Sequence, residues 1–305
     1  MNTASYQTSV IAVPPLARTP EGRVCAAQNT KLIRHMESGG VRILLYGGNA
    51  NFYHIRPSEF ASTLDILANA AGPETEIVPS AGPAYGLMMD QVEILCDHPF
   101  RTAMVLPHVG LNTPDGVATG LRHFAEKYGR PIVIYIKNEG YLTPELAAAL
   151  VKDGIVAWIK YAIVRDDPAR DAVLQELTAL VDPQMIVSGI GEQPALVHLG
   201  LFKLGGFTTG CGCVAPALSQ KVLQLFHGGD LSGANALRKQ FEPLEDLRNE
   251  INPVRVLHEA VTLSGIADMG TILPLLSGLN PVDRSRVQSA AAALLALNTH
   301  PAQKG

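Results

Sequence analysis

A lysine lies in the middle of one of the most apolar segments of the chain. Lys160 is preceded by Ile155–Ile159 and followed by Tyr161–Val164, a pattern typical of a strand that is buried on both faces. Burial disfavours the charged ammonium and lowers the pKa of a lysine, which makes the amine a nucleophile toward a carbonyl carbon. Alternatively, such a lysine pairs with a buried acid or extends past the strand end to water. We interpret Lys160 as a candidate catalytic nucleophile.

A tyrosine and a second lysine share one face of the preceding apolar segment. Tyr135 and Lys137 alternate near the end of Val133–Lys137, and a tyrosine beside an imine-forming lysine can relay protons to and from the carbinolamine oxygen. By itself, a tyrosine in an apolar strand is more often a core residue whose hydroxyl is satisfied. Lys137 is a rival nucleophile, but the polar residues that follow it indicate an exposed rim, where the amine is solvated and reacts poorly. We therefore favour Lys160 as nucleophile, and Tyr135 stays open between a proton relay and a core residue.

Other candidate sites give weaker signals. Gly47–Asn51, Gly-Gly-Asn-Ala-Asn, follows an expected strand, and its glycines let backbone N–H groups approach an anion, although an ordinary turn has the same composition. His108 ends another expected strand and either lines the site or lies in a solvated loop. Cys211 and Cys213 lack zinc-site spacing and are expected to be buried thiols. We therefore expect no metal site.

Short apolar runs separated by helix-like stretches predict a barrel that positions these residues. Because several runs are apolar almost throughout, they indicate parallel strands covered on both faces. Eight such units in about 220 residues fit an α/β fold of the TIM (β/α)₈ barrel type, and a doubly wound sheet is the alternative. The expected strands are Ser9–Pro15, Arg42–Gly47, Glu76–Ala81, Ala103–His108, Ile132–Lys137, Ile155–Ala162, Gln184–Gly189 and Gly206–Gly210.

The pattern changes after residue 228, where apolar strand-like runs stop. Three segments then have the pattern of helices, namely Leu231–Asn249, Pro253–Ser264 and Asp283–Leu297. Within the first part, helices are expected over Pro57–Ala71, Thr113–Tyr128, Thr143–Lys152 and Asp167–Val181, among others. The sequence thus predicts a barrel over 1–228 and a C-terminal helical appendix over 229–305.

Composition narrows the class of protein. The 305 residues contain 47% hydrophobic and 17% charged residues, which excludes a disordered chain. The net charge of −4, without a long run of one sign, argues against nucleic acid or an anionic membrane as partner. The longest apolar stretch, Ala290–Leu297, is far shorter than the roughly 20 residues of a membrane span. With four cysteines and no recognisable secretory signal, we expect a cytoplasmic protein.

Taken in order, these motifs resemble the dihydrodipicolinate synthase/N-acetylneuraminate lyase family of class I Schiff-base aldolases. The resemblance extends over about residues 9–280. Its segments are Val13–Pro15, Gly47–Asn51, Ile55–Glu59, Val78–Gly82, Pro131–Tyr135, Ile159–Lys160 and Gly205–Thr209. It implies a (β/α)₈ barrel with a helical appendix, assembled as a homo-oligomer, either a tetramer or a dimer.

The resemblance also implies residue roles. Lys160 corresponds to the Schiff-base lysine and Tyr135 to the catalytic tyrosine, Gly48 and Asn49 occupy the positions that bind the keto-acid carboxylate, and Thr208 lies near the lysine. The implied activity is that of a lyase, either aldolase or dehydratase, acting on pyruvate or a 2-keto-3-deoxy acid. No cofactor is expected, because the protonated imine withdraws electrons itself.

Several positions depart from the family pattern. Gly48 and Asn49 replace two threonines, and Asn51 replaces a glutamate. Pro107–Val109 lacks the tyrosine that, in the family, one subunit contributes to the site of its neighbour. The loop Lys137–Tyr141 contains no arginine for the carboxylate of a second substrate, and its Glu139 would repel an anion. Two alternatives therefore stay open: dihydrodipicolinate synthase proper, which joins pyruvate and aspartate semialdehyde, and a catalytically lapsed barrel that binds a small keto acid.

Overall fold

The computed structural model describes residues 4–298, and within them nine parallel strands form a single sheet. The spatial order is β3-β2-β1-β9-β8-β7-β6-β5-β4. The strands are β1 (Ile11–Ala12), β2 (Ile43–Leu45), β3 (Glu76–Val78), β4 (Ser80–Ala81), β5 (Met104–Val105), β6 (Ile132–Ile136), β7 (Val156–Tyr161), β8 (Ile186–Ser188) and β9 (Gly206–Thr209).

Eight expected strands become nine because the third is divided at Pro79. Proline has no N–H to donate to a strand ladder, and the chain changes its partner there: β3 pairs with β2, whereas β4 pairs with β5. Since β3 and β4 are joined directly through Pro79, the two ends of the sheet order meet and the barrel closes. The predicted (β/α)₈ barrel is confirmed, and the doubly wound alternative was wrong.

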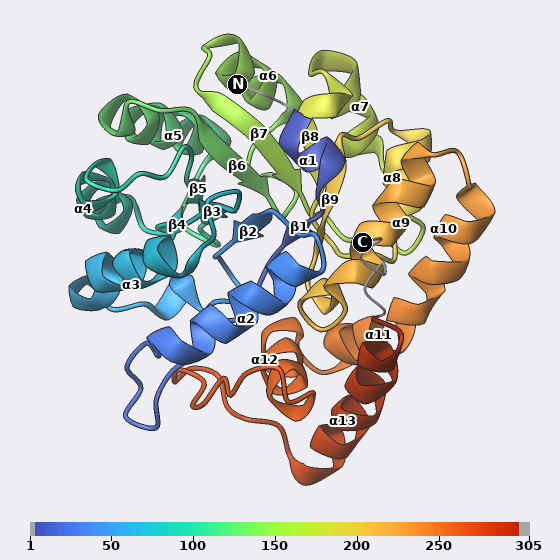
Figure 1. The fold of residues 1–305 in the computed structure, drawn as a ribbon. Coiled ribbons are helices and arrows are strands. Elements are labelled where there is room, and N and C mark those ends of the chain that lie inside the picture. The colour runs from blue at the N-terminus through green and yellow to red at the C-terminus, as the bar shows by residue number, and fades with distance from the viewer. Residues whose placement is uncertain (1–3, 299–305) are drawn as a thin grey trace.

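Helices surround the barrel and connect its parallel strands (Figure 1). Several begin as the sequence predicts: Thr113 and Thr143 each accept a hydrogen bond from the backbone N–H three residues ahead, and a proline follows each cap. The helices of this part are α1 (Ala4–Thr8), α2 (Ala26–Ser38), α3 (Pro57–Ala70), α4 (Tyr85–Cys96), α5 (Pro114–Tyr128), α6 (Pro144–Lys152), α7 (Ala172–Leu180), α8 (Ala195–Leu201) and α9 (Pro216–His227).

The helix expected to begin at Asp167 begins five residues later. Asp171 caps α7, because its carboxylate accepts the Leu174 N–H at 3.1 Å. The same carboxylate also accepts the Tyr161 hydroxyl at 2.7 Å and pairs with the Arg165 guanidinium at 3.0 Å. These tertiary partners fix Asp171, rather than Asp167, at the start of the helix.

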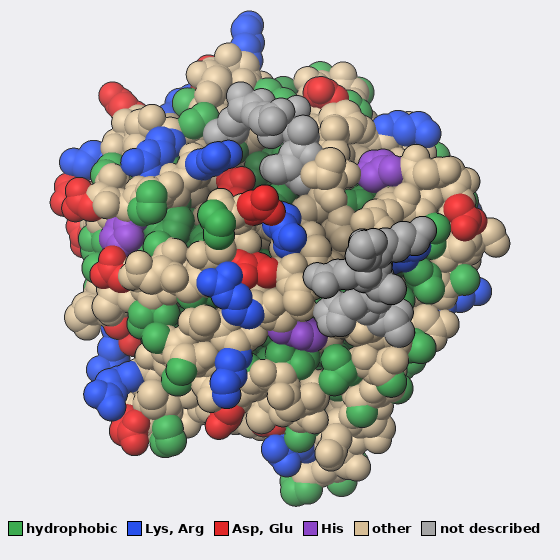
Figure 2. All heavy atoms as spheres, in the orientation of Figure 1, with side chains coloured by type: hydrophobic (Ala, Val, Ile, Leu, Met, Phe, Trp, Pro, Cys, Tyr) green, Lys and Arg blue, Asp and Glu red, His purple; other side chains and the backbone are tan. Residues whose placement is uncertain are grey.

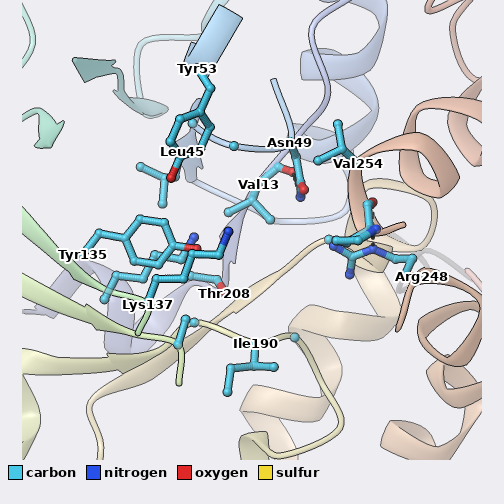
Figure 3. A pocket seen from close by; sticks show the side chains of 18 of the residues that line it. Val13, Leu45, Asn49, Tyr53, Tyr135, Lys137, Ile190, Thr208, Arg248 and Val254 are labelled. Carbon is cyan, nitrogen blue, oxygen red and sulfur yellow. Dashed lines mark hydrogen bonds between the residues drawn. The ribbon is translucent and has the colours of Figure 1, made fainter. Parts of the chain in front are cut away.

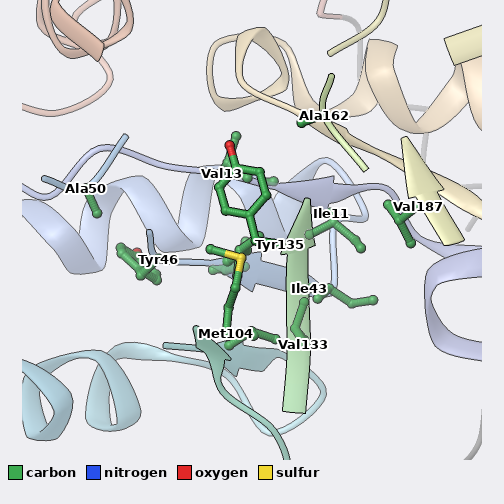
Figure 4. Close-up of a cluster of buried hydrophobic side chains, with 14 of the residues drawn as sticks. Ile11, Val13, Ile43, Tyr46, Ala50, Met104, Val133, Tyr135, Ala162 and Val187 are labelled. Carbon is green, nitrogen blue, oxygen red and sulfur yellow. The ribbon is translucent and has the colours of Figure 1, made fainter. Parts of the chain in front are cut away.

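The barrel interior is packed with apolar side chains. Ile11, Ile43, Met104, Val133 and Val187, all buried, come together from five strands, with Tyr135 beside them (Figure 4). Below them, Trp158 packs against Tyr6 of α1, with their ring centroids 6.2 Å apart. Trp158 and Lys160 share one face of β7, and Trp158 comes earlier in the strand, nearer its N-terminal end. Because α1 packs against Trp158, α1 covers the end of the barrel opposite to the one that Lys160 approaches.

The last four helices lie along one side of the barrel (Figure 1). They are α10 (Leu231–Arg238), α11 (Glu242–Glu250), α12 (Pro253–Leu263) and α13 (Pro281–Ala296). The single helix expected over 231–249 is interrupted by a 3₁₀ turn, Lys239–Phe241, just before Pro243, which cannot donate an N–H into the helix. The division of the chain at residue 228 falls between α9 and α10; it stays a prediction, since one hydrophobic core joins both parts.

The surface has no large area of one charge on the face shown in Figure 2, where basic and acidic side chains are interspersed. No helix in residues 4–298 combines the length and the apolar character that crossing a membrane requires.

Candidate active site

A cavity of about 420 Å³ opens among the loops that follow the C-terminal ends of the barrel strands. This is the end at which barrel enzymes hold their catalytic groups. The cavity brings together all five predicted site residues, Lys160, Tyr135, Gly48, Asn49 and Thr208. Its other walls come from the helical appendix, which contributes residues of α11 and α12 (Figure 3).

Lys160 projects into this cavity from β7 and is nearly buried. Its side chain is 7% exposed, and Lys160 is the register partner of Tyr135 on β6. The Nζ atom lies 4.5 Å from the centroid of the Tyr135 ring. Burial, together with the smaller effect of the positive charges of Lys137 and Arg248, lowers the pKa of Lys160 to about 7. A substantial fraction of the amine is therefore neutral, and nucleophilic, at neutral pH.

Gly189 makes room for the lysine. It follows β8, and a methyl group at its Cα would lie 2.9 Å from Lys160 Cγ and 2.9 Å from the Tyr161 carbonyl oxygen. Both contacts are shorter than carbon atoms tolerate, and the carbonyl belongs to the adjacent strand, so it cannot move aside independently.

This close approach leads to a prediction for Gly189→Ala. Overpacking should cost about 1–3 kcal/mol of stability. It should also displace the Lys160 side chain, so that the folded variant reacts with a keto acid more slowly than the wild type does. Thermal unfolding and the rate of imine trapping, measured on the same preparation, check this. Gly86→Ala is the control, because a methyl group there meets nothing within 4 Å. Unchanged trapping in Gly189→Ala would contradict the packing account.

Tyr135 faces the same cavity and keeps its proton. Burial raises the pKa of its phenol above the usual value, and the phenol of Tyr53 adds to the rise. Its hydroxyl has no hydrogen-bond partner among residues 4–298 and points into the cavity (Figure 3). A protonated hydroxyl without an internal partner is free to donate to a bound substrate.

The glycine loop presents two unused N–H groups. Within residues 4–298, neither the Gly48 N–H nor the Asn49 N–H donates a hydrogen bond, whereas the next two N–H groups donate back to Gly47 and Gly48. The Asn49 side chain donates to the carbonyl of Val13, the residue after β1, at 2.9 Å and so anchors the loop there. Asn51 ends the turn at a φ of 60°, a conformation that asparagine tolerates. Adjacent free N–H groups of this kind suit a carboxylate.

The structure also places the remaining predicted residues. Thr208 is buried on β9 and lines the cavity, and Lys137 is exposed at its rim, as its polar neighbours indicated. His108 does not line it; His108 lies instead in a second cavity between α4 and α5. Cys211 and Cys213 are buried free thiols, as expected. Glu139 does not stand as an unpaired repelling charge, because its carboxylate is paired with Arg165.

The sequence analysis missed Arg248. It lies on α11, is 8% exposed and lines the cavity on the side away from Tyr135 (Figure 3). An arginine thus lines the cavity from an element other than the loop Lys137–Tyr141. Among residues 4–298, no group of three or more His, Cys, Asp and Glu side chains is arranged to hold a metal ion.

Comparisons with solved structures agree with this architecture. The dihydrodipicolinate synthase of Bacillus clausii superimposes with a TM-score of 0.85 at 16% identity, over 95% of this chain and 98% of that one. The sialic acid aldolase of Ruminococcus gnavus gives 0.81 at 16%, over 96% and 98%. YagE of E. coli K12, a prophage protein of the dihydrodipicolinic acid synthase family solved with pyruvate, gives 0.82 at 18%, over 93% and 98%. The sequence matches no family model and no curated protein. The shared feature is the fold.

Proposed function

We propose that the protein is a Schiff-base-forming lyase, either aldolase or dehydratase, of the dihydrodipicolinate synthase/N-acetylneuraminate lyase family. Its substrate is pyruvate or a 2-keto-3-deoxy acid, held as an imine on Lys160. The observation that carries the proposal is Lys160 itself, an almost buried amine with a pKa near 7 that lies over the ring of Tyr135. The fold shared with two aldol-type enzymes and with a pyruvate-bound relative supports it.

The reaction begins with nucleophilic attack. The neutral amine of Lys160 adds to C2 of the keto acid, so a C–N bond forms and the carbonyl electrons move to oxygen, which takes up the proton that the nitrogen loses. Tyr135 then donates its hydroxyl proton to this oxygen, which leaves as water while the nitrogen lone pair forms the C=N bond. The protonated imine accepts the electron pair released when a C–C bond breaks or when a proton leaves C3 before loss of a β-hydroxyl.

The carboxylate of the substrate binds at the glycine loop. The N–H groups of Gly48 and Asn49 have no partner within the described chain and lie beside the same cavity, so they provide two donors for one carboxylate. Thr208, the buried cavity residue on β9, offers a further hydroxyl near the lysine. These contacts fix the keto carbon in front of Lys160 and require no cofactor.

Borohydride trapping tests the proposal. Incubation with pyruvate followed by reduction should add one reduced pyruvate group per chain, because borohydride converts the imine into a stable secondary amine. Omission of pyruvate or of borohydride should leave the mass unchanged. A protein that stays unmodified at saturating pyruvate would favour the lapsed barrel, in which the same cavity binds a keto acid without reacting.

The pH dependence of trapping provides a further prediction. Only the neutral amine attacks, and the pKa of Lys160 is about 7, so the initial trapping rate should rise as the pH increases through about 7 and level off above it. Below that value the rate should fall roughly tenfold per pH unit. Short pulses of pyruvate and cyanoborohydride across the range measure it.

Lys137→Met is the informative variant for this profile. Removing that neighbouring positive charge should raise the pKa of Lys160 and move the midpoint of the profile to higher pH. Lys31, an exposed lysine on α2, serves as a control position when changed to Met. A wild-type midpoint near the ordinary lysine value of about 10.4 would contradict the burial argument.

The synthase proper is a less favoured alternative. Aspartate semialdehyde carries an ammonium group as well as a carboxylate, and no Asp or Glu among residues 4–298 lines the cavity to receive it. From the family resemblance we also propose a homo-oligomer, either a tetramer or a dimer, and from the four cysteines a cytoplasmic location.

A further inference from the structure

Arg248 is built into the cavity wall. A methyl group on Gly210 would lie 2.5–2.6 Å from the nitrogen and carbon atoms of the guanidinium, so the guanidinium lies against the bare backbone after β9. The Arg248 Nε donates to the Pro253 carbonyl at 3.4 Å. The guanidinium of an arginine held in this way has little conformational freedom even without a ligand, which reduces the entropic cost of binding.

Two buried carboxyl groups lie behind the arginine. Glu245 accepts the Glu192 N–H at 2.8 Å, and Glu192 accepts the hydroxyls of Thr209 and of Ser219, the latter at 2.7 Å. Burial raises the pKa of both carboxyls, and Arg248 counteracts that rise. Because two adjacent buried carboxyls share a proton rather than both ionising, they offset at most one positive charge.

The cavity therefore carries an excess of positive charge. Two cationic side chains line it, those of Lys137 and Arg248, beside the partly protonated amine of Lys160, and no carboxylate within residues 4–298 does. Arg248 lies across the cavity from Tyr135 (Figure 3), so it is separated from the place where the keto carbon reacts. The volume of about 420 Å³ exceeds what a three-carbon acid fills.

We propose that Arg248 binds a second carboxylate, at the end of the substrate farthest from the keto carbon. This inference rests on the proposed function and makes it more specific: the substrate is a 2-oxo acid that carries a distal acidic group. One carboxylate binds the N–H groups of Gly48 and Asn49, and the other binds the planar guanidinium, whose paired N–H groups match a carboxylate. Arg248 is thus a specificity-determining residue.

Matched acids test the proposal on the wild-type protein. Borohydride trapping is titrated with 2-oxoglutarate against 2-oxopentanoate, and with 2-oxoadipate against 2-oxohexanoate, which differ only in a carboxylate replaced by methyl. For at least one chain length, the diacid should reach half-maximal trapping at a concentration about 10- to 100-fold lower, the range expected for a hydrogen-bonded charge pair. Equal concentrations at both lengths would overturn the proposal.

Variants locate the effect. Arg248→Gln should abolish the preference for the diacid while 2-oxopentanoate is still trapped, and Arg248→Lys should restore part of it. Lys239→Gln, which removes an exposed charge from the same appendix, should leave the preference unchanged. A preference that survives in Arg248→Gln would overturn the proposal. If that variant does not fold, the comparison of matched acids on the wild type still decides.

Failure of the imine reaction is distinguishable from failure of this proposal. If no keto acid is trapped, pyruvate included, the proposed function is wrong, and calorimetric titration with glutarate and pentanoate then tests the arginine without chemistry. Glutarate should bind about 10-fold or more tightly than pentanoate. Equal affinities would overturn the proposal.

Discussion

Lys160→Met should abolish covalent trapping of pyruvate. Methionine has a similar length and suits an apolar strand, so the barrel should fold, but no amine remains to form the imine. Mass spectrometry of the intact protein after borohydride reduction measures the loss, which should exceed 100-fold in initial rate on the scale of removing a nucleophile.

The matched control for this loss is Lys137→Met. Lys137 is the other lysine of the cavity, but it is exposed at the rim. At about pH 9, where the Lys160 amine is mostly neutral even without the neighbouring charge, this variant should keep most of the trapping. If Lys160→Met were still labelled and Lys137→Met were not, the two assignments would have to be exchanged.

Tyr135→Phe should slow turnover by about 10²- to 10⁴-fold, the usual contribution of a general acid–base group. The change removes one hydroxyl that has no internal hydrogen-bond partner among residues 4–298, so the thermal unfolding temperature should hardly change. Exchange of the pyruvate methyl protons with deuterated water, followed by NMR, measures the imine–enamine steps without knowledge of a second substrate.

Tyr141→Phe provides the comparison for this variant. Tyr141 is also a buried tyrosine whose pKa is raised by burial, but it lines the second cavity rather than the one around Lys160. Its exchange rate should stay close to that of the wild type. If Tyr135→Phe retained more than half of the exchange rate, Tyr135 would be a packing residue only.

Local patterns account for what could be predicted from the sequence. The run Ile155–Ile163 is apolar on both faces apart from Lys160, which is typical of a parallel strand covered on both sides, so the barrel and the unusual position of Lys160 are predicted by the same segment. The pairing of Tyr135 with Lys160 also follows, since neighbouring strands of a barrel end at the same rim. The glycine loop was predicted as an anion site, and its two unused N–H groups support that reading.

The missed features depend on contacts between distant segments. Arg248 lies in a helix rich in charged residues, where an arginine ordinarily faces water; only the fold brings α11 over the bare backbone of Gly210. Likewise, Glu192 and Glu245 are 53 residues apart and meet only in the folded chain. The start of α7 was misplaced for the same reason, because Asp171 is selected by Tyr161 and Arg165.

Peptide mapping of the reduced adduct tests the central claim most directly. Wild-type protein is incubated with pyruvate at about pH 8, where the amine of Lys160 should be largely neutral, then reduced with borohydride, digested and sequenced by mass spectrometry. The proposal predicts a single modified site, at Lys160 in the segment Ile155–Val164. An adduct at any other lysine, or no adduct at saturating pyruvate, would contradict it.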